Sequence, residues 1–310
     1  MSRTPRVVVT PPPVCNSSTL RAELSALFPQ PLFNDKGRYL SEEELIQFAS
    51  EADALLVGRD RVSDQVLSAL PKLKIIAKYG VGLDNIDQAA LEKHQVKLGW
   101  TAGVNRRSVA ELTLGFMLGL CHNMFKSGWA LKQGQWVKDG GCLLQDKTVG
   151  IVGCGNIGKE VVRLLKPFGC RVWIRDIVEM PEFCKDTGAL EKSMAEVLEG
   201  ADIISMHVPL TGDTRHMMNV DAFRRMRSTA FLINTSRGDV VDQTALKDAL
   251  VKENIAGAAL DVFSQEPPED MELLAHPHLM VTPHIGGNAI EAVEAMARAA
   301  FQHLKEYFSQ

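Results

Sequence analysis

Short runs of β-branched and other apolar residues alternate along the chain with longer stretches in which apolar residues recur every three or four positions. Runs of the first kind predict strands, and stretches of the second kind predict amphipathic helices. Regular alternation of the two is typical of α/β proteins with parallel sheets. In the first hundred residues the predicted strands are residues 6–10, 52–58 and 73–80, and the predicted helices are residues 18–28 and 41–51, the latter with Ser41 as N-cap.

A second series of predicted strands begins after residue 145 and forms a complete sheet of its own. Its six strands are residues 147–153, 170–176, 201–208, 229–236, 255–263 and 279–284. Two long helical patterns flank this series, at residues 108–133 and 289–308. Because the second pattern follows the last strand, we expect it to pack back on the N-terminal domain, which is then built from both ends of the chain.

Composition and charge narrow the class of protein. The 310 residues suffice for two domains with hydrophobic cores. With 45% apolar residues, 23% charged residues and a formal net charge of −4, the chain has no basic excess that would attract nucleic acid. The most apolar stretch, residues 112–125, is shorter than the roughly 20 residues that span a bilayer, so we expect a buried helix and no membrane contact.

The six cysteines are spaced irregularly and include no C-x-x-C pair. This spacing favours reduced thiols over a zinc or disulfide-exchange site, as is usual in the cytoplasm. Residues 1–13 hold only a three-valine run before prolines, which is too short for the apolar core of a signal peptide. We therefore expect a cytoplasmic protein without a metal site.

Three glycines follow the first strand of the second series with the spacing G-x-G-x-x-G: Gly153, Gly155 and Gly158. This spacing alone can be a turn that binds nothing, but here a strand precedes it and a helical pattern follows. In a dinucleotide site the first glycine turns the chain, the second admits the pyrophosphate to backbone N–H groups, and the third lets helix and strand pack closely. The context therefore predicts dinucleotide binding.

Asp176 ends the next predicted strand, 23 residues after Gly153. A carboxylate at this place accepts hydrogen bonds from the adenosine ribose and repels a 2′-phosphate, which favours NAD over NADP. Arg175, directly before it, weakens this preference because a guanidinium can bind a phosphate. NAD is the predicted cofactor, with NADP as the alternative.

Three polar residues follow the ends of later strands: Arg237, Glu266 and His284. Taken singly, they can be a surface arginine, a turn carboxylate and a capping histidine. Together, at the strand ends where open α/β sheets bind ligands, they fit hydride transfer between a nicotinamide and a 2-hydroxy acid. A histidine beside a carboxylate can protonate the carbonyl oxygen, and an arginine can bind the substrate carboxylate.

Seven stretches of the chain, in the same order, resemble motifs of the phosphoglycerate dehydrogenase-like D-2-hydroxyacid dehydrogenases. They are residues 78–87, 103–120, 149–161, 207–219, 232–242, 257–268 and 282–287. The resemblance covers essentially the whole chain and implies two Rossmann-like α/β domains with the active site in the cleft between them. An NAD-binding doubly wound parallel sheet is expected at residues 104–287, and a flavodoxin-like substrate domain at residues 1–103 and 288–310.

The resemblance also implies roles for individual residues. Arg237 would bind the substrate's carboxylate and carbonyl, Glu266 would pair with His284, and His284 would be the general acid in reduction and the base in oxidation. The N–H groups of Val81 and Gly82 would cradle the substrate carboxylate without a charged side chain. The cofactor would be bound by Gly153, Gly155, Asn156, Ile157, Gly158, Asp176, Val208, Pro209, Thr235, Ser236, Asp261 and Gly287, with Asp261 on the nicotinamide carboxamide.

The substrate beyond its 2-hydroxy acid group stays open. Arg59 and Arg61 are candidates for binding a distal phosphate or carboxylate, and Arg106 and Arg107 are further cations. The hypothesis is an acid with a second anionic group, with glyoxylate, hydroxypyruvate and phosphite as alternatives on the same fold. Glu266 argues against formate, because formate dehydrogenases of the superfamily carry glutamine there.

Two expectations concern partners. The resemblance implies a homodimer formed through the helical region near residues 105–135. The non-enzymatic alternative is an NAD-sensing corepressor, although relatives of that kind carry long terminal extensions that are almost missing here.

Overall fold

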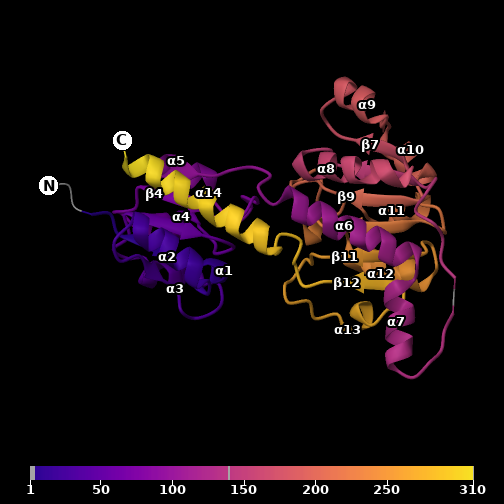
Figure 1. Cartoon of the computed structure of the whole chain (residues 1–310), viewed down its shortest axis with the longest axis horizontal. Helices are drawn as coiled ribbons and strands as arrows, with labels where there is room; N and C mark the ends of the chain where they lie inside the picture. The colour runs from indigo at the N-terminus through magenta and orange to yellow at the C-terminus, as the bar shows by residue number, and fades with distance from the viewer. Residues whose placement is uncertain (1–3, 139, 310) are drawn as a thin grey trace. The chain divides into compact units, whose positions relative to one another are not determined.

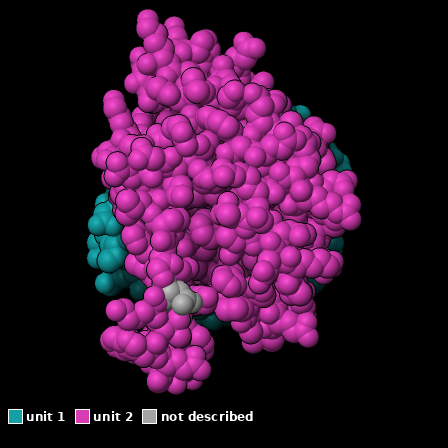
Figure 2. Space-filling model, turned by 90° about the vertical axis from the view of Figure 1, so that its right-hand side faces the viewer, with its two compact units in different colours: residues 1–105, 287–310 teal, residues 106–286 magenta. Residues whose placement is uncertain are grey.

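The computed structural model of the chain describes residues 4–138 and 140–309, which form two compact units (Figure 1). Unit 1 combines the chain up to Asn105 with the chain from Gly287 onward, and unit 2 is Arg106–Gly286 (teal and magenta in Figure 2). These limits lie within two residues of the predicted ones at 103/104 and 287/288. Each unit is a parallel sheet with helices on both faces, so the predicted α/β class is confirmed.

Unit 1 contains a five-stranded sheet in the order β2-β1-β3-β4-β5, which is the flavodoxin-like order. Its strands are β1 (Val7–Val9), β2 (Leu32–Phe33), β3 (Ala54–Val57), β4 (Ile75–Lys78) and β5 (Lys97–Gly99). The sequence predicted only β1, β3 and β4. β2 and β5 are two and three residues long and lie at the sheet edges, so they are too short to produce a pattern.

Helices cover both faces of this sheet because successive strand residues enter two different cores. Val7 and Val9 pack against α1, α2 and α14, whereas Val8 packs against α3, α4 and α5. The helix α14, drawn in yellow in Figure 1, therefore packs back on the N-terminal sheet as predicted. The helices are α1 (Pro12–Cys15), α2 (Ser18–Leu27), α3 (Glu42–Phe48), α4 (Asp64–Ala69), α5 (Gln88–Lys93) and α14 (Ile290–Phe308). Ser41 caps α3 with a reciprocal capping box to Glu44, as its place in the sequence indicates.

Unit 2 contains a seven-stranded parallel sheet in the order β12-β11-β10-β9-β6-β7-β8. Its strands are β6 (Thr148–Val152), β7 (Arg171–Arg175), β8 (Leu190–Glu191), β9 (Ile203–Met206), β10 (Phe231–Asn234), β11 (Gly257–Leu260) and β12 (Leu279–Val281). The sequence predicted six of these strands and missed the edge strand β8. Its two residues are both exposed, so no apolar run marks them.

Two helical layers enclose the unit 2 sheet, with Ile151 and Ile233 facing one layer and Val152 and Leu232 the other. The first layer contains α6 (Arg106–Cys121) and α8 (Asn156–Leu165), and the second contains α10 (Met194–Gly200), α11 (Val220–Arg225) and α12 (Gln243–Val251). The remaining short elements are α7 (Met124–Lys132), α9 (Pro181–Thr187), α13 (Met271–Leu274) and the 3₁₀ turns η1 (Lys166–Phe168) and η2 (Gly238–Val240).

The single long helix predicted at residues 108–133 is two helices. Asn123 has a φ of +49°, a left-handed conformation that ends α6 and redirects the chain into α7. The apolar stretch predicted as a buried helix falls mainly in α6, where Phe116 and Met117 are buried in the core. In the described part of the chain, no helix has the length and apolar character needed to cross a membrane.

Candidate active site

The candidate residues of unit 2 lie where its parallel strands end. In an open parallel sheet all carboxyl ends share one edge, and ligands bind where the strand order reverses. This reversal falls between β6 and β9, which are neighbours in the sheet although β7 and β8 separate them in sequence. Gly153 follows β6, and Val208 and Pro209 lie just beyond β9, so the glycine loop is at the switch point.

The glycine loop has a geometry that only glycine permits at two of its three positions. Gly153 has a φ of +90°, and a Cβ on it would lie 2.7 Å from the backbone C and O atoms of His207. A Cβ on Gly158 would lie 2.2 Å from the carbonyl oxygen of Gly153. A Cβ on Gly155, in contrast, would meet no atom of the described residues within 4 Å. The first and third glycines are therefore structural, and the second leaves space beside the N-terminus of α8.

These features fit a dinucleotide. Asn156 and Ile157 begin α8, whose N-terminal N–H groups and dipole attract a pyrophosphate. The Asp176 carboxylate lies beside the loop, because its Oδ2 accepts the N–H of Cys154 at 2.6 Å. Its Oδ1 accepts the N–H of Val178 at 3.0 Å. A carboxylate has about four acceptor sites, so ribose hydroxyls can still bind to it.

The histidine behind the glycine loop, His207, was not singled out from the sequence. Its Nε2 lies 2.9 Å from the Ser205 hydroxyl, while its buried Nδ1 has no partner among the described residues. Burial lowers the pKa of His207 to about 3, so the ring is neutral. A buried polar atom without a protein partner fits a site that a ligand or water completes.

The turn after β10 is held by its own side chains. Thr235 and Ser236 are buried, and the Thr235 hydroxyl lies 3.1 Å from that of Thr113. Ser236 donates to the side-chain oxygen of Asn234 at 2.7 Å, and the Asn234 amide donates to the carbonyl of Arg237 at 2.9 Å. This network fixes the backbone from which the Arg237 side chain extends.

Arg237 is half-buried, and its Nη1 donates to the carbonyl of Ser236 at 2.7 Å. The next residue, Gly238, touches the segment after β11, since a Cβ on it would lie 1.9 Å from the carbonyl carbon of Phe263. Glu266 belongs to that segment. The glycine of the S-R-G-D sequence thus lets the arginine turn and the glutamate segment pack together, a role that the sequence analysis missed.

His284 and Glu266 form the pair that the sequence predicts. The His284 Nδ1 lies 2.8 Å from Oε2 and 2.9 Å from Oε1 of Glu266, whose Oε1 also accepts the N–H of Phe263 at 3.2 Å. The backbone of His284 is left-handed, with a φ of +55°, and its N–H donates to the carbonyl of Asp261 at 2.8 Å. Because Nδ1 binds the carboxylate, Nε2 is the ring nitrogen suited to exchange a proton with a substrate.

Asp261 organises the segment that carries His284. Its buried carboxylate accepts hydrogen bonds from the Thr282 hydroxyl at 2.6 Å, the Ile285 N–H at 2.8 Å and the Gly286 N–H at 2.8 Å. The resemblance predicts a role for Asp261 in cofactor binding alone. The spacing between residues 261 and 282–286 gives no sign of these hydrogen bonds, so they were not predicted.

In unit 1 the predicted carboxylate cradle is the loop after β4. Gly80 has a φ of +100°, and among the described residues none accepts the backbone N–H of Val81 or of Gly82. The Val81 carbonyl accepts the indole N–H of Trp100 at 3.1 Å, which anchors the loop. Gly287, expected in the NAD-binding domain, lies in unit 1.

The candidate arginines have different surroundings. The Arg59 Cζ atom lies 5.0 Å from the centre of the Tyr39 ring. Arg61 forms an ion pair with Glu42, with 3.1 Å between Nε and Oε1, and Arg107 forms ion pairs with two glutamates of unit 2. Arg59 therefore lies beside an aromatic ring, and Arg61 and Arg107 lie beside carboxylates.

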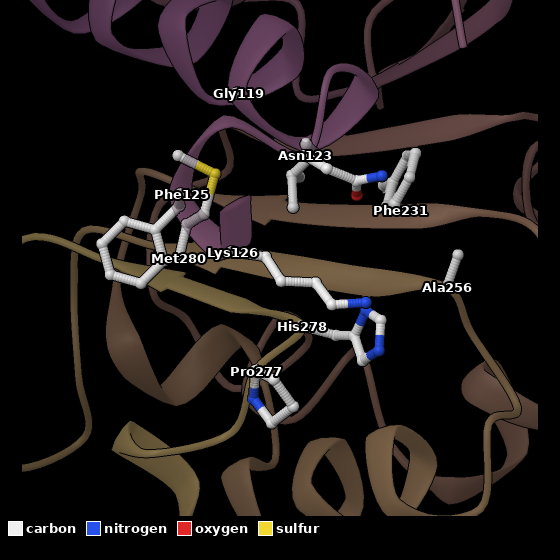
Figure 3. Close-up of a pocket in the computed structure, with 10 residues that line it drawn as sticks. Gly119, Asn123, Phe125, Lys126, Phe231, Ala256, Pro277, His278 and Met280 are labelled. Atoms are coloured by element: carbon white, nitrogen blue, oxygen red, sulfur yellow. The ribbon is translucent and has the colours of Figure 1, made fainter. Parts of the chain in front are cut away.

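A pocket of unit 2 lies at the other edge of the sheet (Figure 3). Its lining includes Phe231, the first residue of β10, Ala256, which precedes β11, and His278, which precedes β12. Pro277 and Met280 line it from β12 and the turn before it, and the other lining residues come from α6, the start of α7 and Asn123 between these helices. The predicted site residues follow the strands instead of preceding them, so this pocket is separate from the candidate active site.

A doubly wound sheet with a dinucleotide loop and a histidine–glutamate pair at its carboxyl edge defines a dinucleotide-dependent oxidoreductase. The sequence model for "D-isomer specific 2-hydroxyacid dehydrogenase, NAD binding domain" matches residues 114–286. The chain belongs to the D-isomer specific 2-hydroxyacid dehydrogenase family. The predicted resemblance and the predicted enzyme class, an NAD-dependent dehydrogenase, are thereby confirmed.

Individual relatives agree with the family. The chain is 38% identical over 273 residues to a glyoxylate reductase of Thermofilum pendens, covering 85% of this chain and 80% of the relative. It is 37% identical over 272 residues to a D-3-phosphoglycerate dehydrogenase of Methanocaldococcus jannaschii, covering 86% of this chain and about half (52%) of that relative. The crystal structure of an Aquifex aeolicus D-lactate dehydrogenase with NAD and lactic acid superposes with a TM-score of 0.86 at 27% identity, covering 98% of this chain and 96% of that one.

Proposed function

We propose that the protein reduces a 2-oxo acid to the D-2-hydroxy acid, or catalyses the reverse oxidation, with NAD as cofactor and His284 as the proton-transfer residue. The observation that carries the proposal is the His284–Glu266 pair, with its Nδ1–Oε2 distance of 2.8 Å. It lies at the sheet edge that also carries the glycine loop and Arg237. Bound at that loop, the nicotinamide would supply or accept the hydride.

The residues of the chain then divide the remaining tasks. His284 protonates the carbonyl oxygen through Nε2, and Glu266 stabilises the charged ring. Arg237 binds the carboxylate and polarises the carbonyl, because its planar guanidinium can donate two parallel hydrogen bonds. The Val81 and Gly82 N–H groups bind the carboxylate. The cofactor contacts are assigned to Gly153, Gly155, Asn156, Ile157, Gly158, Asp176, Val208, Pro209, Thr235, Ser236, Asp261 and Gly287.

A spectrophotometric screen at about 340 nm tests this proposal. The panel contains glyoxylate, hydroxypyruvate, pyruvate, 2-oxoglutarate and phosphohydroxypyruvate with NADH, and D- and L-hydroxy acids with NAD in the reverse direction. Turnover of 2-oxo acids together with oxidation of D-acids only is the expected result. NADH binding without turnover of any acid would refute it, and phosphite and corepressor peptides would be tested next.

Asp176 is proposed to select NAD over NADP. Replacing it with asparagine removes the negative charge but keeps an acceptor oxygen for one of the two neighbouring N–H groups. We expect the ratio of kcat/KM for NADPH to that for NADH to rise about 10- to 100-fold, because a like charge next to a 2′-phosphate costs several kcal/mol. Asp186→Asn, on α9, serves as the control. An unchanged ratio would assign the discrimination to other residues, with Arg175 tested next.

A homodimer through α7 is proposed from the surface of that helix. None of the α7 residues is buried, and Phe125, Trp129 and Leu131 are exposed apolar side chains. Several large apolar side chains exposed on one short helix are candidates for a protein interface. Light scattering should give twice the chain mass of 34.1 kDa for the parent, and close to 34.1 kDa for Trp129→Glu/Leu131→Glu. Val251→Glu, at an exposed apolar position on α12, is the control, and an unchanged mass in the double variant would contradict the interface.

A further inference from the structure

Two cysteines of unit 2 lie side by side although they are far apart in the sequence. Cys121 is the last residue of α6, and Cys142 belongs to the segment that leads into β6. The N–H of Cys142 donates to the carbonyl of Cys121 at 2.7 Å. The thiol of Cys121 is in addition hydrogen-bonded to the side chain of Cys142. The two residues are therefore in contact through both their backbones and their thiols.

The close approach of the two segments depends on Gly141. A Cβ on this glycine would lie 2.0 Å from the carbonyl oxygen of Cys121, so no side chain fits there. A second link comes from Asn123, whose side-chain amide donates to the carbonyl of Gly140 at 2.9 Å. The place of Cys142 beside the end of α6 is thus fixed by contacts that do not involve its sulfur.

The backbone hydrogen bond also limits the distance between the two α-carbons. The amide nitrogen is bonded directly to the α-carbon of Cys142, and the carbonyl oxygen lies about 2.4 Å from the α-carbon of Cys121. Since nitrogen and oxygen are 2.7 Å apart, the α-carbons are separated by at most about 6.6 Å. Disulfides join α-carbons about 4.4–6.8 Å apart, so a bond between these two sulfurs needs no large movement of the backbone.

The surroundings give the two thiols different tasks. Cys121 is buried, and this burial, with the neighbouring Cys142, raises the pKa of Cys121 to about 12. Cys121 therefore keeps its proton at neutral pH. Cys142 is only half-buried, so it is the thiol of this pair that an oxidant in solution reaches first, with Cys121 behind it.

We propose that Cys121 and Cys142 form a reversible disulfide when the protein is exposed to a hydroperoxide. With hydrogen peroxide, the Cys142 sulfur attacks one oxygen, so that an S–O bond forms, the O–O bond breaks and water leaves. The Cys121 sulfur then attacks the sulfur of this sulfenic acid. An S–S bond forms while the S–O bond breaks, and the hydroxide leaves with the Cys121 proton as a second water. Together the thiols lose two electrons and two protons, which reduce the peroxide to two waters.

The disulfide encloses α7 in a covalent loop and joins the end of α6 to the segment before β6. The end of α6 lies at the edge of the sheet where the strands begin, because Gly119 and Leu120 line a pocket with Phe231, the first residue of β10. The glycine loop and His284 follow their strands, at the opposite edge. We therefore expect the disulfide to stabilise unit 2 and to leave NADH binding unchanged.

Peptide mapping of the full-length protein tests the pairing. The protein is treated with hydrogen peroxide, alkylated with N-ethylmaleimide and digested with trypsin without reductant. Trypsin separates the two cysteines, because Lys126 and Lys132 lie between them. We expect one cross-linked peptide pair, about 2 Da lighter than the two thiol peptides together, that dithiothreitol separates.

Three variants assign the roles of the individual thiols. In Cys121→Ser, Cys142 should stop at the sulfenic acid, which dimedone traps. In Cys142→Ser no disulfide should form, and this half-buried position keeps the test valid if the buried substitution prevents folding. Cys170→Ser is the control and should match the parent, because the Cys170 thiol donates to the carbonyl of Leu144 at 3.4 Å.

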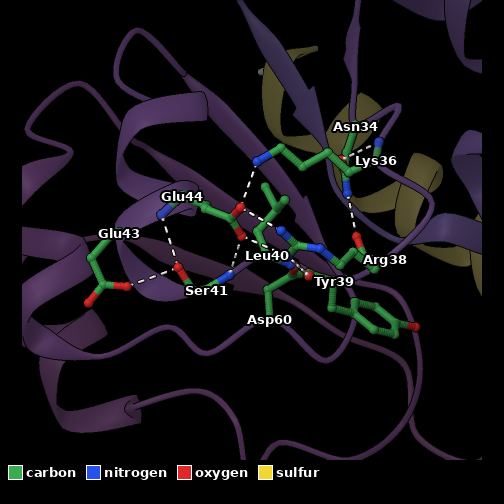
Figure 4. Close-up of polar contacts among 9 residues, drawn as sticks. All are labelled: Asn34, Lys36, Arg38, Tyr39, Leu40, Ser41, Glu43, Glu44 and Asp60. Carbon is green, nitrogen blue, oxygen red and sulfur yellow. Dashed lines mark hydrogen bonds and ion pairs between the residues drawn. The ribbon is translucent and has the colours of Figure 1, made fainter.

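Stability is the second readout. Closing the loop should raise the melting temperature of the peroxide-treated parent by about 5–10 °C over that of the reduced protein. Cys142→Ser should show no rise. Ser41→Ala, which removes the capping box of α3 in unit 1 (Figure 4), should melt at a lower temperature but keep the full rise on oxidation.

Several results would overturn the inference. They are alkylation of both cysteines after peroxide treatment, a disulfide that includes Cys170 or Cys184, and a covalent dimer through Cys142. A disulfide that forms without raising the melting temperature, or that weakens NADH binding, would refute the stabilising role. Neither readout needs a substrate, so the outcome does not depend on the proposed function.

Discussion

Replacing His284 is expected to lower kcat by about 10²- to 10⁴-fold, the usual contribution of a general acid or base. The ring is bound through Nδ1 to the Glu266 carboxylate, so its loss removes the proton donor at Nε2 and leaves the glycine loop unchanged. The Kd of NADH, measured by fluorescence titration, should therefore stay close to that of the parent. This combination separates a catalytic role from a contribution to cofactor binding.

Two variants are needed at this position because the His284 backbone is left-handed, with a φ of +55°. Asparagine adopts this conformation readily, whereas alanine is strained there by roughly 1–2 kcal/mol. His284→Asn and His284→Ala should share the loss of kcat, and only the alanine variant should also melt at a lower temperature. His278→Ala, at the opposite edge of the same sheet, is the control. Turnover within about twofold of the parent in His284→Asn would assign proton transfer to another group.

The residues with the strongest chemical constraints were the ones predicted from sequence. Gly153 and Gly158 are places where no side chain fits, and this restriction leaves a spacing that can be read in the sequence. The pairing of Glu266 with His284, 18 positions apart, followed from the resemblance and is present in the structure. What these residues do in the reaction remains a prediction that kinetics must test.

Other features depend on contacts that no local pattern records. Asn123 breaks the expected long helix because its backbone is left-handed, although the apolar pattern continues through it. Asp261 binds residues 282–286 through three hydrogen bonds that the fold brings within reach. Tyr39, which follows β2, meets Arg59, which follows β3, because the sheet places β2 and β3 on the two sides of β1. Such tertiary contacts become visible once the strand order is known.

Replacing Gly155 with alanine is expected to weaken NADH binding about 10- to 100-fold while the free protein remains folded. The added methyl group meets no atom of the described residues within 4 Å, so it extends into the space assigned to the pyrophosphate. Crowding of a close-packed contact costs about 1–3 kcal/mol, which corresponds to this change in Kd. The free energy of unfolding should fall by no more than about 1 kcal/mol, because Gly155 is the N-cap of α8 and alanine is a poorer N-cap.

Gly153→Ala is the matched contrast, because there the methyl group would lie 2.7 Å from the backbone of His207 and φ is +90°. This variant should lose stability without ligand, by roughly 1–3 kcal/mol or more, since backbone atoms cannot move aside as a side chain can. Denaturant unfolding and NADH titration of both variants separate the two roles. If Gly155→Ala binds NADH as tightly as the parent, the pyrophosphate does not approach the second glycine. If it unfolds as readily as Gly153→Ala, the space beside the helix N-terminus is structural, and the dinucleotide must bind elsewhere along the carboxyl edge of the sheet.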